Sequence, residues 1–318
     1  MAVTYVTPVF EAEVPLLLLQ ARSLARHVPP GDDVVVLDNT RRGLRDQPAL
    51  LAAYGAHAPH VEILRPRDVC AMPPAPGWSS QQVLKLAVAA RVLTPHYVAL
   101  DAKNHFVAAP AARYFVGDDG RARVRATAYT THNLRPKLEL VCAYLGLDPA
   151  PLVPRFSATV TPFTLDRDTV LAMTADVEAR AGRPFAREFI ARGLTEFFLY
   201  SGWVLRRDGS LDAVMDLVDQ PNPMVWPGRA TAAGVRAAID EAAGAPVFGV
   251  HRRAIPRLDD DAVALLAQFW AARGLVDDEA AGVALLRGLQ ARHRRDAALQ
   301  RVRDLPGKAV KTALRLRA

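Results

Sequence analysis

The feature that most constrains this chain is the way short apolar runs alternate with helical segments at its start. Residues 3–9 form an apolar run rich in β-branched side chains, and the Thr7-Pro8 pair marks the point where this predicted strand enters a loop. Residues 33–39 form a second such run, and a helical stretch at 13–27 lies between the two. Continuous apolar strands are typical of parallel sheets covered on both faces. The start of the chain therefore predicts an α/β fold.

The same alternation continues toward the middle of the chain. Helices are expected at 44–55 and 81–93, the second capped by Ser79 or Ser80, and a proline-rich loop is expected around 73–76. The sequence patterns that predict helices and strands become weaker after residue 104. The remaining expected elements are strands at 61–64 and 97–101, β-like pieces at 122–129 and 158–163, helices at 138–145, from 166 or 167 to 181, at 185–190 and at 195–204, a late strand at 247–251, and helices from 259 to about 303.

The composition agrees with a globular chain of one large domain and a smaller appendage. The sequence has 318 residues, of which 51% are hydrophobic and 23% charged, so it can bury a substantial core. We expect a catalytic domain over 1–256 and a helical, basic C-terminal extension over 257–318. The longest apolar stretch near the N-terminus, 14–19, is far shorter than a membrane span. A cytoplasmic location is therefore expected, with Cys70 and Cys142 as ordinary reduced residues.

The positive charge of the chain is concentrated at its C-terminus. Residues 287–318 contain ten Lys or Arg against two Asp, a net charge of +8, which leaves −1 for the rest of a chain whose total is +7. The globular part is thus nearly neutral, which disfavours general polyanion binding and nucleic acid as a partner. Apolar residues interspersed in the tail allow weak peripheral contact with an anionic membrane face, or packing of a plain helix on the catalytic domain.

Four groups of residues stand at loop or strand-end positions where a parallel sheet could bring them together. They are Thr7 and Pro8, Asp38 and Asn39, Asp101 with Lys103 and Asn104, and His251. The carboxyl ends of parallel strands are where ligands bind in open α/β sheets. A nucleotide is expected to lie across this edge.

The sequence lacks the motifs of several enzyme classes that have similar sheets. No GxGxxG follows the first strand, so a dinucleotide oxidoreductase is disfavoured. The chain also has no GxxxxGK[ST] loop and no GxSxG element, which excludes P-loop enzymes and serine hydrolases of that type. A nucleotidyltransferase is the nearest enzymatic rival, but its glycine-rich first loop is missing.

Five segments in order resemble the GT-A glycosyltransferases, and more narrowly a bacterial glycosyltransferase-like group of unknown function. The segments are Val6–Phe10, Trp78–Leu86, Tyr97–Asn104, Thr195–Tyr200 and Val250-His251. The resemblance covers roughly residues 3–256. It implies a GT-A-like, nucleotide-diphospho-sugar transferase fold, with a mostly parallel central sheet flanked by helices. By the same resemblance, Thr7, Pro8, Asp38, Asn39, Lys85, Lys103 and Asn104 are candidates for binding the nucleotide sugar.

The metal site of that family is altered in this chain. GT-A enzymes hold a divalent cation against the diphosphate with an Asp-x-Asp element, whereas this sequence has Asp101-Ala102-Lys103-Asn104. Either Asp101 and His251, together with Asn104, form a poor Mg²⁺ or Mn²⁺ site, or the Lys103 ammonium neutralises phosphate charge itself. Asp101 alternatively bonds a ribose hydroxyl or backbone amides.

Glu196 is the candidate catalytic base, together with Asp101 as a catalytic residue. The resemblance places Glu196 where a carboxylate takes the proton from the attacking hydroxyl of the acceptor, and Phe197 and Phe198 supply apolar surroundings. Its alternative role is that of a first-turn carboxylate at a helix N-terminus. Lys85 either reaches the diphosphate or is a solvated helical lysine.

The resulting hypothesis is a hexosyltransferase-type enzyme that uses a nucleotide sugar, by default a uridine diphosphate sugar. Its acceptor is a glycan or lipid-linked molecule, and surface-polysaccharide synthesis is the setting that the resemblance implies. The alternative is a non-catalytic protein that binds a nucleotide or glycan on a degenerate GT-A fold, which the Lys103 substitution favours.

Overall fold

The computed structural model describes the backbone of residues 2–315 and the side chains of residues 2–298. The chain divides into two compact units. The first unit comprises Met1–Pro223 and Glu241–Phe248, and the second comprises Met224–Asp240 and Gly249–Ala318.

A five-stranded sheet in the order β3-β2-β1-β4-β8 forms the centre of the first unit. The four strands from β3 to β4 are parallel, and β8 is an antiparallel edge strand next to β4. The predicted α/β class with a mostly parallel sheet is therefore confirmed. The strands are β1 (Thr4–Val9), β2 (Asp33–Asp38), β3 (Val61–Leu64), β4 (His96–Ala99) and β8 (Phe163–Asp166).

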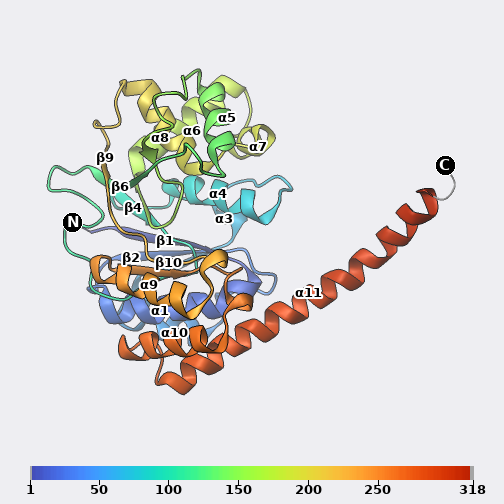
Figure 1. Cartoon of the computed structure of the whole chain (residues 1–318). Coiled ribbons are helices and arrows are strands. Elements are labelled where there is room, and N and C mark those ends of the chain that lie inside the picture. Colours follow the sequence, from blue (N-terminus) through green and yellow to red (C-terminus); the bar gives the residue numbers. More distant parts are fainter. Residues whose placement is uncertain (1, 316–318) are drawn as a thin grey trace. The chain divides into compact units, whose positions relative to one another are not determined.

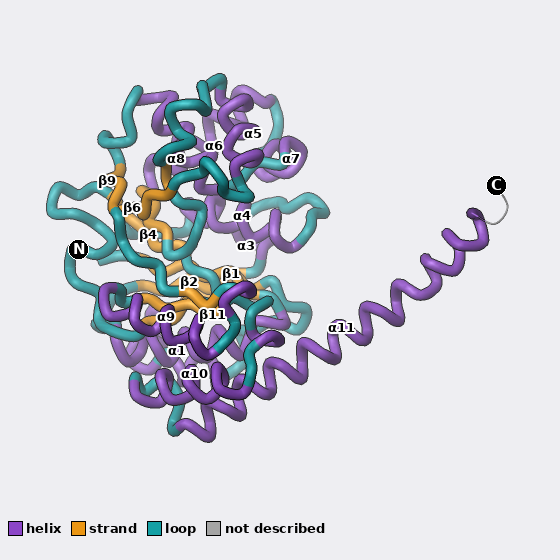
Figure 2. The backbone as a smooth tube through the Cα atoms, in the orientation of Figure 1, coloured by secondary structure: helices purple, strands orange, loops and turns teal. Residues whose placement is uncertain are grey.

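Helices cover both faces of this sheet. Figure 1 shows α1 on one face and α4 on the other, and Figure 2 separates these helices from the strands and loops. A continuous hydrophobic core joins the α4 side of the sheet to helices α5–α8. The helices of this unit are α1 (Val14–His27), α2 (Pro48–Ala53), α3 (Pro66–Val69), α4 (Gly77–Ala87), α5 (Arg135–Leu145), α6 (Arg167–Ala181), α7 (Phe185–Arg192) and α8 (Glu196–Asp208).

Shorter elements complete the first unit. A second sheet has the order β7-β6-β9, in which β6 is parallel to β9 and antiparallel to β7. Its strands are β6 (Ala122–Thr127), β7 (Phe156–Ser157) and β9 (Met215–Val218). Strand β5 (Asn104–Phe106) follows β4 closely. The 3-10 helices of this unit are η1 (Glu11–Glu13), η2 (Gly55–His60), η3 (Val88–Ala90) and η5 (Ala242–Gly244).

The second unit is mainly helical. In it β10 (Met224–Val225) pairs in parallel with residues 249 and 250 of β11 (Val247–Val250). Helix α11 (Glu279–Arg315) packs on α10 (Asp260–Ala272) at Gly282, where a Cβ atom would lie 2.9 Å from Cα of Ala267, so only glycine permits this approach. The predicted helical C-terminal extension is confirmed. The remaining elements are α9 (Ala232–Glu241), η4 (Pro227–Arg229) and η6 (Ile255–Arg257).

None of the helices in the described part of the chain is both long enough and apolar enough to cross a membrane. The tail residues on which the predicted membrane contact depends, from Leu299 onward, lie outside the described side chains.

Strand β1 differs from its prediction at its C-terminal end. Thr7 and Pro8 do not start a loop, because β1 continues to Val9 and Pro8 pairs with Leu37 of β2. Asn39 N donates to Val9 O on the β2 side, so the preceding residue, Pro8, faces the β4 side. Leu100 N donates to Val6 O, and the next bond of this parallel ladder would need an N–H at position 8. Pro8 has none, so the pairing with β4 ends at Val6.

The start of α4 and two other expected elements also differ from the predictions. Helix α4 begins at Gly77, so Ser79 and Ser80 lie inside it and do not cap it; the Ser80 hydroxyl donates back to Pro76 O. The expected 44–55 helix is limited to α2 and followed by η2, with prolines inside both elements. The expected strand at 158–163 is wrong, since β7 ends at Ser157 and β8 begins at Phe163.

Candidate active site

A tight turn places Asp101 directly after strand β4. Asn104 N donates to Asp101 O at 2.9 Å, and Asn104 Oδ1 accepts from Asp101 N at 2.9 Å. The Asn104 amide also donates to Thr161 O at 3.3 Å, and its side chain is buried. Asn104 therefore closes the turn that orients Asp101. Its predicted contact with a nucleotide stays a prediction.

Two lysines converge on the Asp101 carboxylate from different elements. Lys85 Nζ, from α4, lies 2.7 Å from Asp101 Oδ1, and Lys103 Nζ bonds to Asp101 Oδ2. The Thr161 hydroxyl donates to the same Oδ2 at 3.1 Å. Burial opposes ionisation of Asp101, but the charges of Lys103 and Lys85 outweigh it and hold the pKa of Asp101 well below its usual range. Asp101 is thus ionised at neutral pH.

Glu196, the first residue of α8, completes this group from the other side of Lys85. Its Oε1 lies 3.6 Å from Lys85 Nζ, and its backbone N–H donates to Gln82 Oε1 at 3.2 Å. Burial raises the pKa of Glu196 above its usual value, and Lys85 offsets only part of this effect. Burial would lower the pKa of Lys85, but Asp101 and Glu196 raise it overall, so its ammonium stays charged. We call Lys85, Asp101, Lys103 and Glu196 the lysine–carboxylate cluster.

The members of the cluster differ in their access to solvent. Asp101 and Lys103 are 22% and 16% exposed at the side chain, whereas Lys85 and Glu196 are 5% and 8% exposed. The Lys85 ammonium lies 5.4 Å from the centre of the Phe197 ring, which itself stacks on Phe163 with ring centres 4.0 Å apart. Asp101 and Lys103 therefore form the accessible side of the cluster, and Lys85 and Glu196 form its apolar, buried side.

Buried Gln20 of α1 connects strand β1 to the Asp101 turn. Its amide donates to Asp101 O at 2.9 Å and to Asn104 O at 2.7 Å, and its Oε1 accepts from the Thr7 hydroxyl at 2.8 Å. Thr7 is therefore joined to the Asp101 turn by one intervening side chain. Thr7 and Gln20 are both fully buried.

Asp38 holds the loop after β2. Its Oδ1 accepts from the backbone and hydroxyl of Thr40, and its Oδ2 accepts from Leu44 N and from Arg65 Nη1, both at 2.8 Å. Burial would raise the pKa of Asp38, but these hydrogen bonds lower it overall. Asn39 follows, with its backbone N–H bonded to Val9 O. The expected nucleotide contacts of Asp38 and Asn39 stay predictions.

The donor set at Asp101 does not fit a divalent cation as the side chains stand. Each Asp101 oxygen is ion-paired with an ammonium group, so a cation would have to displace Lys85 or Lys103. Among the described residues there is no group of three or more His, Cys, Asp or Glu side chains that is arranged to hold a metal ion. His251 lies in the second unit, where its Nδ1 accepts from Arg253 N and its ring lies 5.3 Å from that of Trp226.

Sequence reasoning missed Gln20 and Thr161. The signal for Gln20 was present, because a lone amide follows a run of four leucines in the predicted helix, and buried polar groups need partners. Thr161 gave no such signal, since it contacts Asp101 from a loop 60 residues away.

The chain belongs to a family of unknown function, DUF6492, whose model matches residues 54–226, more than half of the chain. The matched range contains all four residues of the lysine–carboxylate cluster. No curated protein matches the sequence.

Three solved structures that match the chain, each with a TM-score below 0.5, are of glycosyltransferases. The galactosyltransferase LgtC, solved in complex with donor and acceptor sugar analogues, is 12% identical with a TM-score of 0.49, covering 85% of this chain and 95% of that one. An active-site mutant of LgtC is 13% identical with a TM-score of 0.38, covering 61% and 70%. The bifunctional glycosyltransferase WbbM in its apo form is 12% identical with a TM-score of 0.43, covering 79% and 45%.

Proposed function

We propose that this chain transfers a sugar from a nucleotide-sugar donor to an acceptor hydroxyl. The observation that carries the proposal is the lysine–carboxylate cluster at the carboxyl end of β4, where Lys103 and Lys85 both pair with Asp101 and Lys85 also lies next to Glu196, whose pKa is raised. That sheet edge is where nucleotides bind in open α/β folds. The hexosyl donor, the uridine base and a surface-polysaccharide or lipid-linked acceptor are further parts of this proposal, and they rest on the sequence resemblance.

In the proposed reaction the lysines stabilise the leaving group. A nucleoside diphosphate gains negative charge as it departs, and preorganised cations aimed at it lower the barrier. Lys103, which is accessible, bonds the phosphate oxygens, while buried Lys85 adds a second positive charge behind Asp101. Asp101 orders both ammonium groups before the donor arrives. No step depends on a divalent cation.

Glu196 is the proposed general base. The acceptor oxygen attacks the anomeric carbon, and the bond from that carbon to the diphosphate oxygen breaks with its electron pair leaving on the diphosphate. The hydroxyl proton passes to the Glu196 carboxylate. Burial next to Phe197 raises the pKa of Glu196, which makes it a better proton acceptor than a solvated glutamate. A single displacement of this kind inverts the anomeric configuration.

Calorimetry with uridine and guanosine diphosphates, each with chelator and with Mn²⁺, tests the donor site. We expect one of them to bind in chelator, and Lys103→Met to weaken that binding by about 10- to 150-fold, because a charge-assisted hydrogen bond contributes about 1.5–3 kcal/mol. Lys137→Met is the matched control, since among residues 2–298 the Lys137 ammonium bonds only Gly193 O. No binding of either nucleotide under any condition would refute the donor site.

Turnover separates the enzyme from the non-catalytic alternative. Glu196→Gln should keep diphosphate binding and lower the rate of sugar-nucleotide cleavage by about 100-fold or more, the range of general-base effects. If the wild type binds the nucleotide sugar yet neither hydrolyses nor transfers it, the chain is a binding protein.

A further inference from the structure

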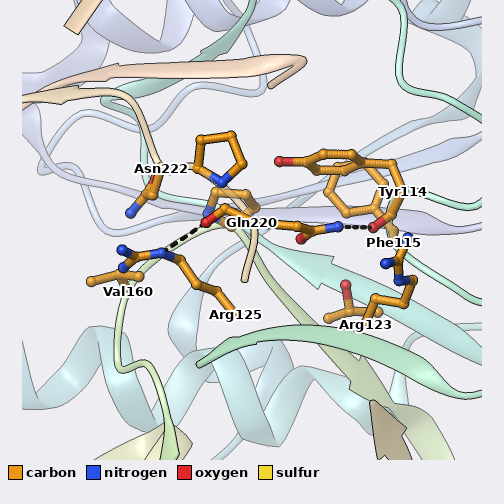
Figure 3. A pocket seen from close by; sticks show the side chains of 10 residues that line it. Tyr114, Phe115, Arg123, Arg125, Val160, Gln220 and Asn222 are labelled. Atoms are coloured by element: carbon orange, nitrogen blue, oxygen red, sulfur yellow. Dashed lines mark hydrogen bonds between the residues drawn. The ribbon is translucent and has the colours of Figure 1, made fainter. Parts of the chain in front are cut away.

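A small pocket of the first unit carries more positive charge than its partners neutralise. It encloses about 320 Å³ including its open mouth, and it is lined by residues of β6, of the 160–164 segment and of the 220–222 segment (Figure 3). Strand β6 alternates: Ala122 and Val124 are buried in the core, while Arg123 and Arg125 point to the opposite face and line the pocket. This alternation brings two guanidinium groups to one cavity.

Gln220 holds Arg125 in place and leaves its outer nitrogens available. Arg125 Nε donates to Gln220 O at 2.9 Å, and the Gln220 amide donates to Tyr114 O at 3.0 Å, as the dashed lines in Figure 3 mark. Within residues 2–298 no carboxylate forms an ion pair with Arg125. The two Nη groups of a fixed guanidinium form a fork that matches two oxygens of a carboxylate or phosphate.

Other donors of the pocket complement this fork. In Figure 3 the Asn222 amide and the Arg125 guanidinium lie toward the same end of the pocket, and Arg123 lies toward the other. Arg123 Nη1 donates to Arg113 O at 3.1 Å, and its Nε is 3.9 Å from Asp216, so its charge is only partly offset. Burial raises the pKa of Tyr114 to about 12 although both arginines lower it, so the lining phenol stays neutral.

We propose that this pocket binds the oxyanion of a small ligand, a phosphate or a carboxylate borne by a sugar, through the Nη groups of Arg125 and the amide of Asn222. The figure of about 320 Å³ includes open solvent, and a water-sized atom can be centred in only about 20 Å³ of it, so the pocket takes the oxyanion itself and the rest of the ligand stays outside. The anion site itself does not depend on the proposed glycosyl transfer, whereas the sugar as carrier of the anion rests on it.

The pocket is distinct from the lysine–carboxylate cluster but shares a wall with it. Val160, Pro162 and Thr164 line the pocket, whereas Thr161 between them donates to Asp101. Loss of one site by mutation can therefore be measured separately from loss of the other.

Calorimetric titration with inorganic phosphate, with glucuronate and with neutral glucose tests the proposal. The wild type should bind phosphate or glucuronate but not glucose, and Arg125→Gln should lose one binding equivalent or weaken it about tenfold or more. Arg125→Lys keeps the charge without the two-pronged guanidinium, so its affinity should lie between those of the wild type and Arg125→Gln. Tighter phosphate binding assigns a phosphorylated ligand, and tighter glucuronate binding assigns an acidic sugar.

Arg155→Gln is the matched control, because Arg155 bonds Asp219 and Leu217 O beside the pocket without lining it. Circular dichroism of each variant establishes that it is folded, and Arg125→Lys carries the test if Arg125→Gln does not fold. Equal binding of phosphate and glucuronate by the wild type and the Arg125 variants would overturn the proposal. Absence of binding to the wild type, or an equal loss in Arg155→Gln, would overturn it as well.

Discussion

Replacing Lys85 by methionine tests whether its ammonium is the centre of the lysine–carboxylate cluster. At an effective dielectric constant of about 20, its separations of 2.7 Å from Asp101 and 3.6 Å from Glu196 correspond to attractions of about 6 and about 5 kcal/mol. The cost of burying the charges offsets much of this in the wild type. Lys85→Met leaves two carboxylates short of a partner, and we expect the free energy of unfolding to fall by about 3–5 kcal/mol.

The loss of unfolding free energy caused by Lys85→Met should be larger at high pH than at low pH. The pKa of Glu196 is already raised by burial, and Lys85 is the group that lowers it, so removing Lys85 raises it further. The folded state then favours protonated Glu196. The contribution of this group to the free energy of unfolding is fully present below its ordinary pKa of 4.5 and is lost as pH rises through the raised value. Lys85→Met should therefore be more destabilising at pH 8 than at pH 5.

Urea denaturation followed by tryptophan fluorescence at both pH values measures this effect. The double variant Lys85→Met/Glu196→Gln should recover part of the loss at pH 8, because it removes the unpaired carboxylate. The control Lys137→Met loses a single hydrogen bond to Gly193 O and should cost about 1 kcal/mol at both pH values. A loss below about 1 kcal/mol for Lys85→Met, or one that is equal at pH 5 and pH 8, would refute the reasoning.

Three further predictions concern other parts of the chain. Gln20→Leu should lower the free energy of unfolding by about 2–4 kcal/mol in urea, because it leaves the Thr7 hydroxyl and two carbonyls without their partner, while Gln47→Leu should cost about 1 kcal/mol or less. Asp38→Asn should cost about 3 kcal/mol at pH 7. The pKa of Asp38 is lowered below 3.8, so the contribution of Asp38 to the free energy of unfolding is present above that pH and is lost as pH falls through the lowered value. If the difference in unfolding free energy between Asp38→Asn and the wild type does not narrow in acid, this explanation is contradicted. Deletion of residues 299–318 should abolish sedimentation with anionic vesicles at low salt, and retention of binding would exclude the basic tail as the membrane contact.

The central sheet was predictable because the burial of its strands is visible in their local sequence. All six residues of β1 are buried, as are five of the six in β2, so both are continuous apolar runs. The β6–β9 pairing left no comparable mark, since Ala122 pairs with Met215 across more than 90 residues and β6 alternates small and charged side chains. The start of α4 was missed for a related reason. Gly77 packs against the Phe10 ring, where a Cβ would lie 3.1 Å from Cζ, and this contact is not visible in the helix sequence.

The site was predictable only at the ends of sheet strands. The rule that ligands gather at the carboxyl edge of a parallel sheet selected Asp101, and the structure places Lys103 and Asn104 in the same turn. The pairing of Lys85 with both Asp101 and Glu196 depends on where α4 and α8 pack, and neither helix shows it alone. The lysine therefore remained open between a solvated residue and a site residue until its burial was known.

The exchange of a second carboxylate for Lys103 changes the charge of the proposed donor site as well as one of its ligands. An Asp-x-Asp pair is anionic and needs a cation before it can hold a diphosphate. Here Asp101 already holds two ammonium groups, so the three side chains carry a net positive charge before any donor binds. An arriving diphosphate would compete with the Asp101 carboxylate for Lys103, exchanging one ion pair for another. Nucleotide binding by such a site should weaken steeply as salt increases and should respond little to chelator, which is the opposite of what a metal-bridged diphosphate predicts.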